Sequence, residues 1–174
     1  ADFEALAPAR VRRMIVRIGN REKVTRLPEP ALGLSRYRFD HLLLEKAKEN
    51  GSQVHSAGSN ASVIATGRSS SQPRGDRFFG FKAHFEGPLD DAVELYFFDG
   101  CYVGLNCIES GLTNVCGLGP EGLLQEHGFD IDVVMRRGHA LTRRLEPLRR
   151  SMKWLFSGPL EFGNRLQAPR EDVY

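Results

Sequence analysis

Residues 78–118 read FFGFKAHFEGPLDDAVELYFFDGCYVGLNCIESGLTNVCGL, and this stretch decides the fold. Its first segment, FFGFKAHF, alternates apolar side chains with Gly, Lys and His, which is the period-two pattern of a strand with one buried face. Asp99-Gly100 and Ser110-Gly111 are turn signals between the strand-like segments that follow. Strands joined by short turns form an antiparallel meander, so the stretch predicts the centre of an antiparallel sheet.

The flanking segments add another strand and several helices. Residues 9–18 alternate basic and apolar side chains as a strand does, and Pro28 and Pro30 are expected to break the chain after it. A helix is expected between the N-cap residue Ser35 and the stop signal Gly51. From Gly122 on, a helical pattern is expected, with an apolar stripe of Leu141, Leu145, Leu148, Met152 and Leu155. Pro147 is expected to start a new helix or to kink this one, and residues 158–174 are expected to be extended. The expected fold class is therefore α+β, an antiparallel β-sheet of about four to six strands with helices packed on one face.

Length and composition point to one globular domain over residues 1–174. Hydrophobic residues at 41% and charged residues at 26% exclude a disordered chain, a collagen and a coiled coil. We expect a soluble protein, because neither a membrane-spanning run nor a secretory signal is visible. Three cysteines in one strand-rich region favour reduced thiols and a cytoplasmic location, and without histidines at ligand spacing no metal site is expected.

The net charge of +2 hides a strong segregation of charge along the chain. Residues 1–82 hold 15 Lys and Arg against 8 Asp and Glu, whereas residues 83–135 hold 10 Asp and Glu and no Lys or Arg. Residues 136–174 hold 9 Lys and Arg against 4 Asp and Glu. Such segregation reflects which surfaces face which partners, and it says nothing about fold.

Two motifs have an ordinary explanation beside a functional one. Residues 117–122, GLGPEG, match the dinucleotide fingerprint G-x-G-x-x-G, but the surrounding βαβ unit is missing. We interpret them as a strand-to-helix turn. The arginines of residues 136–150 could contact phosphates, but they fall opposite the Leu/Met stripe as on any solvated face. No nucleic acid partner is therefore expected.

Three segments, taken in order, resemble the middle of the FAD-dependent oxidoreductases related to p-hydroxybenzoate hydroxylase. The first is LSRYRFDHLLLEKAKENGSQV (34–54), similar to the family's arginine-containing helix and following strand. The second, VIATGRSSSQPRG (63–75), resembles the family's Ala-(Asp/Ser/Thr)-Gly-Arg stretch. The third is FFGFKAHFEG with the meander after it, similar to the sheet that roofs the substrate cavity above the flavin. The geranylgeranyl-reductase-like and halogenase-like branches resemble the chain most.

The resemblance assigns roles to particular residues. Arg36 would be the helix arginine that reaches FAD, and Thr66 and Gly67 would lie in the turn beside the cofactor. The family often has Asp in place of Thr66, so a carboxylate hydrogen bond is not expected there. The inner face of the sheet would shape the substrate pocket with four candidates, Lys82, His84, Tyr102 and Asn106. No residue is singled out as catalytic.

The chain also departs from the family pattern. The glycine-rich loop that binds the FAD pyrophosphate and the Gly-Asp motif beyond the sheet are not in the sequence given. Residues 56–62 look like a linker or an excised segment. The resemblance therefore implies the substrate-binding domain of an FAD-dependent oxidoreductase, monooxygenase-like or reductase-like, which alone would be inactive and would bind FAD weakly or not at all.

The expected partners are a small apolar or aromatic substrate and NAD(P)H or another electron donor. The alternative is a non-catalytic α+β module that binds an apolar ligand or a partner protein, as the aromatic-rich sheet would also allow.

Overall fold

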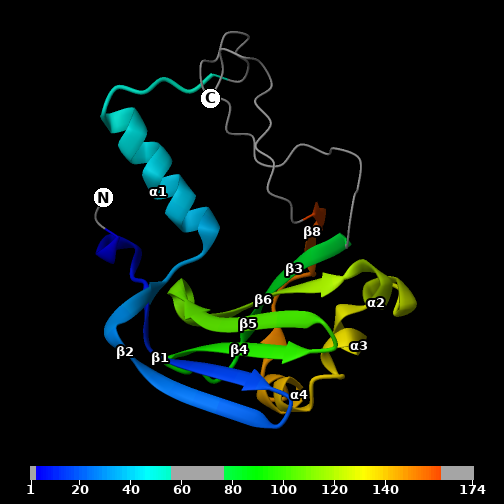
Figure 1. Ribbon diagram of the computed structural model, residues 1–174. Helices are drawn as coiled ribbons and strands as arrows, with labels where there is room; N and C mark the ends of the chain where they lie inside the picture. The colour runs from blue at the N-terminus through cyan, green and yellow to red at the C-terminus, as the bar shows by residue number, and fades with distance from the viewer. Residues whose placement is uncertain (1–2, 56–76, 162–174) are drawn as a thin grey trace.

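The computed structural model describes residues 3–55 and 77–161, and the proposed linker at 56–62 lies outside them. Figure 1 shows a twisted sheet with one helix on one side and three short helices on the other. The strands are β1 (Ala9–Ile18), β2 (Arg21–Gly33), β3 (Arg77–Glu86), β4 (Ala92–Phe98), β5 (Cys101–Ile108), β6 (Leu112–Pro120), β7 (Arg149–Arg150) and β8 (Leu155–Glu161). The helices are α1 (Arg36–Glu49), α2 (Glu121–Glu126), α3 (Ile131–Met135) and α4 (His139–Leu145), with short 3-10 turns η1 (Glu4–Leu6) and η2 (Glu109–Gly111).

The sheet is larger than predicted and it is mixed. Its eight strands follow the order β2-β1-β4-β5-β6-β3-β7, with β8 also paired to β3. The predicted meander β4-β5-β6 is confirmed, and β3 pairs with β6. However, β1 lies parallel to β4, so the expectation of a purely antiparallel sheet of four to six strands is wrong. The parallel pair joins segments about eighty residues apart in the chain, and no local pattern encodes such a pairing.

The tight turn between β4 and β5 forms as its sequence predicts. Asp99 and Gly100 both have positive φ, 47° and 75°. Two successive residues with positive φ match the twist of the flanking strands, and Asp-Gly is a favoured pair for such a turn. The turn thereby sets the register in which Phe97 faces Tyr102 across the two strands.

Helices cover one face of the sheet, and the core lies between them. The buried cluster combines Phe81, Ala83, Phe85, Tyr96, Cys101, Val103, Leu105 and Val115 from the strands with Leu124, Ile131, Val134, Met135 and Leu141 from α2, α3 and α4. The predicted apolar face of β3, including Phe81 and Phe85, is therefore confirmed. By contrast, α1 buries no residue and lies on the other side of the sheet from α4 (Figure 1).

The prolines do not break the chain where they were expected to. Strand β2 runs through Pro28 and Pro30 to Gly33. The register jumps here, since Val11 pairs with Ala31 whereas Arg13 pairs with Arg26. The prolines thus lie in a bulge of an edge strand, where their missing N–H groups break no ladder.

The helical pattern expected on both sides of Pro147 is wrong beyond Pro147, where the described chain forms strands. Helix α4 ends at Leu145, and Pro147 follows within two residues. The chain then pairs with β3 twice, as β7 and as β8. Leu148 and Met152 still pack against the core from extended chain, but Leu155 is 53% exposed. The helical spacing of these residues was therefore coincidental.

Among the described residues, no helix is both long and apolar enough to cross a membrane.

Candidate functional site

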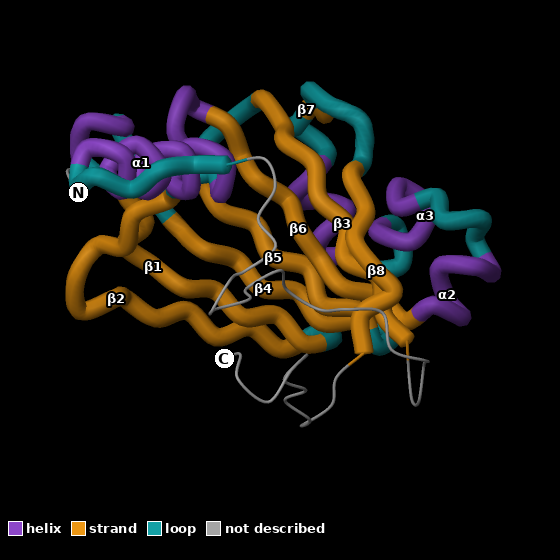
Figure 2. Tube along the Cα trace, turned by 90° about the horizontal axis from the view of Figure 1, so that it is seen from above, coloured by secondary structure: helices purple, strands orange, loops and turns teal. Residues whose placement is uncertain are grey.

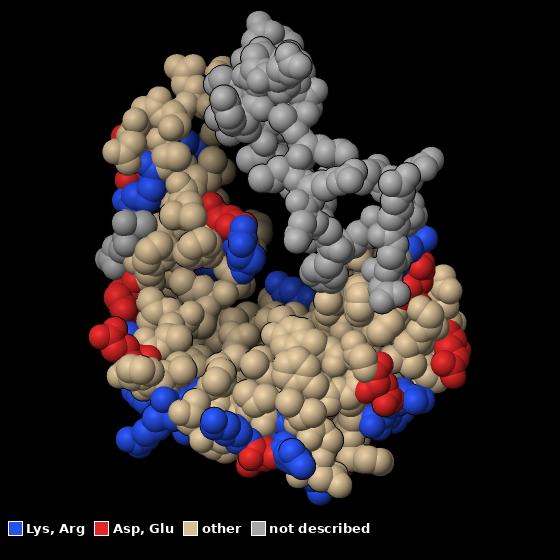
Figure 3. Space-filling view, in the orientation of Figure 1, with Lys and Arg blue, Asp and Glu red and all other residues tan. Residues whose placement is uncertain are grey.

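The face of the sheet that points away from α2–α4 carries the four predicted substrate residues; we call it the open face. Lys82 and His84 alternate with the core residues of β3, and the cross-strand register places Lys82 opposite Cys116 and His84 opposite Asn114. The same register places Asn114 opposite Asn106. Since residues paired directly across strands share one face, these side chains lie together. Figure 2 shows these strands side by side, and Figure 3 shows a hollow over the sheet beside α1.

A row of polar side chains, His84, Asn114 and Asn106, crosses the three strands β3, β6 and β5. Asn114 Nδ2 donates to Asn106 Oδ1 at 3.3 Å, and Asn106 Nδ2 donates to the Cys107 carbonyl at 3.0 Å. His84 Nε2 is buried and has no hydrogen-bond partner within the described part of the chain. A buried polar atom without a partner is uncommon in a folded protein, so this nitrogen is free to meet a ligand or water.

The surroundings of His84 lower its pKa and so favour the neutral imidazole. Burial lowers its pKa most, the neighbouring Lys82 ammonium lowers it further, and Glu109 opposes both. A neutral imidazole has one donor and one acceptor nitrogen, so it can both donate a hydrogen bond to a ligand and accept one from it.

Lys82 is the positive charge of the open face. It is half-buried, and no carboxylate of the described chain lies within ion-pair distance of its ammonium. Cys116, opposite it, stays a thiol because burial raises its pKa more than Asn114 and Lys82 lower it. Lys82 thus offers an unpaired cation to an acidic ligand group, while Cys116 does not act as a thiolate nucleophile.

Aromatic rings adjoin this polar row. The Phe97 and Tyr102 rings lie 5.5 Å apart between centroids, and about a third or more of each side chain is exposed, 38% and 37%. A Cβ at Gly104 would lie 2.9 Å from Tyr102 Oη, so glycine is needed for the tyrosine to lie over β5. Burial also raises the pKa of Tyr102 and keeps its hydroxyl protonated. The open face thus has an apolar part and a polar part, which suits an amphiphilic ligand.

The described residues include one of the three predicted cofactor residues, Arg36. Arg36 is the first residue of α1; its side chain is 81% exposed and its Nε pairs with Asp40 at 3.0 Å. Thr66 and Gly67 lie outside the described residues. Helix α1 is tied to the sheet instead by Ser35, whose backbone N–H and Oγ both donate to the buried Glu109 carboxylate at 2.8 and 2.5 Å.

The G-x-G-x-x-G stretch is not a nucleotide loop. Gly117 and Gly119 belong to β6, which ends at Pro120. A Cβ at Gly117 would lie 2.5 Å from the Phe81 ring, and one at Gly119 would lie 3.3 Å from Cys101 Sγ. The first two glycines therefore make room for core side chains, which confirms the strand-to-helix interpretation.

Four of the six arginines of residues 136–150 form ion pairs among the described residues, and the six do not lie on one continuous basic helix. Arg137 pairs with Asp99, Arg149 with Glu86, Arg150 with Asp132, and Arg144 with Glu94. The expectation that they share one solvated helix face is wrong, because α4 ends at Leu145.

Asn114 and Cys116 on the open face and Glu94 on the opposite one were not among the residues expected from the sequence. The signal for the first two was the meander register, since residues opposite Asn106 and Lys82 must share their face. Glu94 was signalled by its place at an inward position of the apolar strand VELYFF.

No protein-family profile and no curated protein matches the chain. Solved structures do match it. CmlS, a flavin-dependent halogenase, has a TM-score of 0.68 and 15% identity over 88% of this chain and 38% of its own. The myxobacterial chondrochloren halogenase CndH, an FAD-dependent halogenase, has a TM-score of 0.68 and 14% identity over 91% and 50%. A geranylgeranyl bacteriochlorophyll reductase-like protein of Thermoplasma acidophilum has a TM-score of 0.58 and 12% identity over 86% and 49%.

The chain therefore has the fold of one part of FAD-dependent halogenases and geranylgeranyl reductase-like flavoproteins, as the three sequence segments predict. It spans half or less of the length of these three structures. At this level of identity the likeness establishes the fold, and function has to be argued from the site.

Proposed function

We propose that the chain is the substrate-binding portion of an FAD-dependent oxidoreductase, monooxygenase-like or reductase-like. The observation that carries the proposal is the open face, on the fold of flavoproteins. There Lys82, which has no carboxylate partner among the described residues, and His84, whose pKa is lowered, share a face with the exposed rings of Phe97 and Tyr102. In such an enzyme the flavin supplies the redox chemistry, while the protein binds and orients the substrate and keeps water away.

The described residues do not by themselves hold FAD. Arg36 is exposed and paired with Asp40, and the space beside Gly117 and Gly119 is filled by core side chains. A dinucleotide needs backbone N–H groups around its pyrophosphate, and these glycines cannot provide them. We therefore assign this part of the chain a role in substrate binding and no step of the flavin chemistry. A cytoplasmic location and NAD(P)H or another electron donor complete the proposal.

The chemistry of the open face defines the ligand that we propose. Phe97 and Tyr102 suit a planar apolar or aromatic body. Lys82 and His84 suit an acidic or hydrogen-bond-accepting group at one end of that body. The Lys82 ammonium has no carboxylate partner among the described residues, and His84 Nε2 has no hydrogen-bond partner among them. A small aromatic acid combines the two features.

Titration with a matched pair of probes tests this proposal. With the full 174-residue chain labelled for NMR, 2-naphthoate should shift the resonances of Lys82, His84, Tyr102 and Asn106. Lys82→Met should lower the affinity for 2-naphthoate by about tenfold, the loss expected for one charge-assisted contact. It should leave the affinity for the neutral 2-naphthamide unchanged.

Lys153→Met is the matched control, because Lys153 is exposed and has no ion-pair partner within the described residues. The proposal fails if Lys153→Met weakens 2-naphthoate as much as Lys82→Met does. It also fails if the shifted resonances lie on the face covered by α2–α4.

Helix α1 favours a second candidate, a partner-binding module. It buries no residue, and Tyr37, Leu43 and Leu44 are exposed at 79%, 41% and 41%. These side chains would be covered by a partner protein in a non-catalytic module, or by the cofactor-binding portion in a flavoenzyme. A longer natural form of the protein that reduces a bound flavin would decide for the enzyme.

A further inference from the structure

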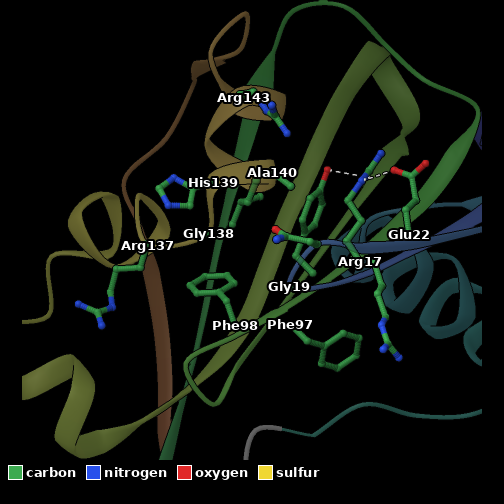
Figure 4. A pocket seen from close by; sticks show the side chains of 14 residues that line it. Arg17, Gly19, Glu22, Phe97, Phe98, Arg137, Gly138, His139, Ala140 and Arg143 are labelled. Carbon is green, nitrogen blue, oxygen red and sulfur yellow. Dashed lines mark hydrogen bonds and ion pairs between the residues drawn. The ribbon is translucent and has the colours of Figure 1, made fainter.

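A cavity lies where α4 approaches the turn between β1 and β2. Its volume is about 300 Å³. The turn residues 19–22 form one wall, residues 138–141 form another, and the rings of Tyr96 and Phe98 lie between them. Figure 4 shows Phe98 beside Gly138, where a Cβ would lie only 3.0 Å from the Phe98 ring. We call this cavity the arginine pocket.

The arginine pocket has a surplus of positive charge. Arg17, Arg21, Arg137 and Arg143 line it, with Glu22 as the one lining carboxylate within the described chain. Glu22 pairs with Arg17 at 2.6 Å, and Asp99 pairs with Arg137 at 2.5 Å. Arg21 and Arg143 have no carboxylate of the described residues within ion-pair distance. Within the described residues, two positive charges of the lining therefore have no carboxylate partner.

A buried network holds one wall of the arginine pocket in place. The Glu94 carboxylate, with 3% of its side chain exposed, accepts from Arg17 at 2.7 Å, from Arg144 at 2.6 Å and from Tyr96 Oη at 2.6 Å. Arg17 also lies 5.0 Å from the centroid of the Tyr96 ring. Arg17 and Tyr96 are thus fixed before any ligand arrives, which lowers the entropy lost on binding.

The free arginines come from different elements. Arg21 begins β2, and Arg143 belongs to α4. In Figure 4, Arg143 extends toward the side of the cavity where Arg17 meets Glu22, whereas Arg137 points away. The guanidinium of Arg143 therefore points into the cavity from α4, and a guanidinium fork suits an ion with several oxygens, since it can take two of them.

We infer that the arginine pocket binds the phosphate group of a small molecule. A phosphate carries about two negative charges near neutral pH, which equals the unbalanced charge of the lining, whereas a single carboxylate would leave one arginine unpaired. Phe97 of the open face also lines this cavity, but the arginines that carry the inference are distinct from Lys82 and His84, so different substitutions test the two proposals.

Calorimetric titration of the full 174-residue chain at low salt tests the inference, with inorganic phosphate, ADP and acetate as probes. Phosphate and ADP should each bind at one saturable site, and acetate should bind at least about tenfold more weakly. Tighter binding of ADP than of phosphate would identify a phosphate ester as the natural ligand, and equal binding would identify the phosphate group alone.

Substitutions locate the binding. Arg143→Gln and Arg21→Gln should each lower the affinity for phosphate by about tenfold. Arg143→Lys should lower it less, because lysine keeps the positive charge but lacks the two-pronged guanidinium. Arg26→Gln removes the same charge from an exposed, unpaired position of the same strand as Arg21 and should change the affinity less than twofold. All three arginines are exposed, so folding is not at stake. Equal weakening by Arg26→Gln, acetate binding as tight as phosphate, or no saturable binding would each overturn the inference.

Discussion

At the scale of single residues, Glu94 is the most demanding position in the protein. It is buried on the core side of β4, and an isolated charge there would be strongly unfavourable. Burial works to raise its pKa, but hydrogen bonds from Tyr96, Arg144 and Arg17 together outweigh burial and hold the pKa below its usual value. The hydrogen bond to Glu94 also makes Tyr96 hard to ionise, because burial and the Glu94 carboxylate both raise the pKa of the Tyr96 phenol.

We predict that Glu94→Gln lowers the free energy of unfolding by about 3 kcal/mol at pH 7, because it leaves two partly buried arginines without their carboxylate. Tyr96→Phe removes one hydrogen bond and should cost about 1 kcal/mol. Urea denaturation followed by circular dichroism measures both. A loss for Glu94→Gln no larger than that for Tyr96→Phe would contradict the assignment of Glu94 as the centre of the network.

The same carboxylate has a defined pH dependence. Because its folded-state pKa is lowered, its contribution to stability is present above the unfolded value, near 4.5, and is lost as the pH falls below it. Stability of the natural protein should therefore drop more steeply than that of Glu94→Gln below about pH 4.5.

At the scale of elements, α1 depends on its first turn. The helix buries no residue, so packing contributes little to it, whereas Ser35 Oγ accepts from the Arg38 N–H and donates to Glu109. We predict that Ser35→Ala destabilises α1 by more than about 1 kcal/mol, because the helix loses its N-cap and the Glu109 carboxylate loses a hydrogen-bond donor. Hydrogen exchange should accelerate over residues 36–49 and stay unchanged in β5 and β6. Ser35→Thr keeps a hydroxyl and is the control; uniform acceleration across the sheet would show that the effect is global.

The elements also show what local sequence can predict. Helix α1 and strands β3 to β6 follow from caps, period-two alternation and turn residues, all of which act between near neighbours. The parallel pairing of β1 with β4 and the addition of β7 and β8 to the edge of β3 depend on distant partners. Alternation places Lys82 with His84, and Tyr102 with Asn106, on one face of their own strands; that the two pairs share a face of the sheet follows from the register between β3, β6 and β5. The positions of Asn114 and Cys116 on the same face could be predicted only with the register between strands. The arginine pocket could not be predicted from local sequence, because it forms where α4 approaches a turn that is distant in the chain.

At the scale of the whole molecule, the two faces of the sheet divide its properties. Helices α2–α4 cover one face and enclose the core, while α1 lies on the side of the other face and buries no residue. The acidic block of residues 83–135 supplies many of the carboxylates that pair with arginines of the two basic blocks, as Glu94 does with Arg17 and Arg144. The charge segregation in the sequence is therefore partly internal balance, and only the arginines left over are available to a ligand.

This division predicts how the chain behaves toward a flavin. Because Gly117 and Gly119 are packed against core side chains and Arg36 is exposed and paired with Asp40, the described residues offer no pyrophosphate cradle, and the chain spans half or less of the flavoproteins that share its fold. We expect the purified 174-residue chain to carry far less than one FAD per molecule, measured by its visible absorbance after dialysis against excess FAD. A stoichiometric flavin spectrum would contradict this prediction and would place the cofactor site within residues 1–174. In that case Arg36→Gln should release the flavin, with Arg26→Gln as the control of equal charge.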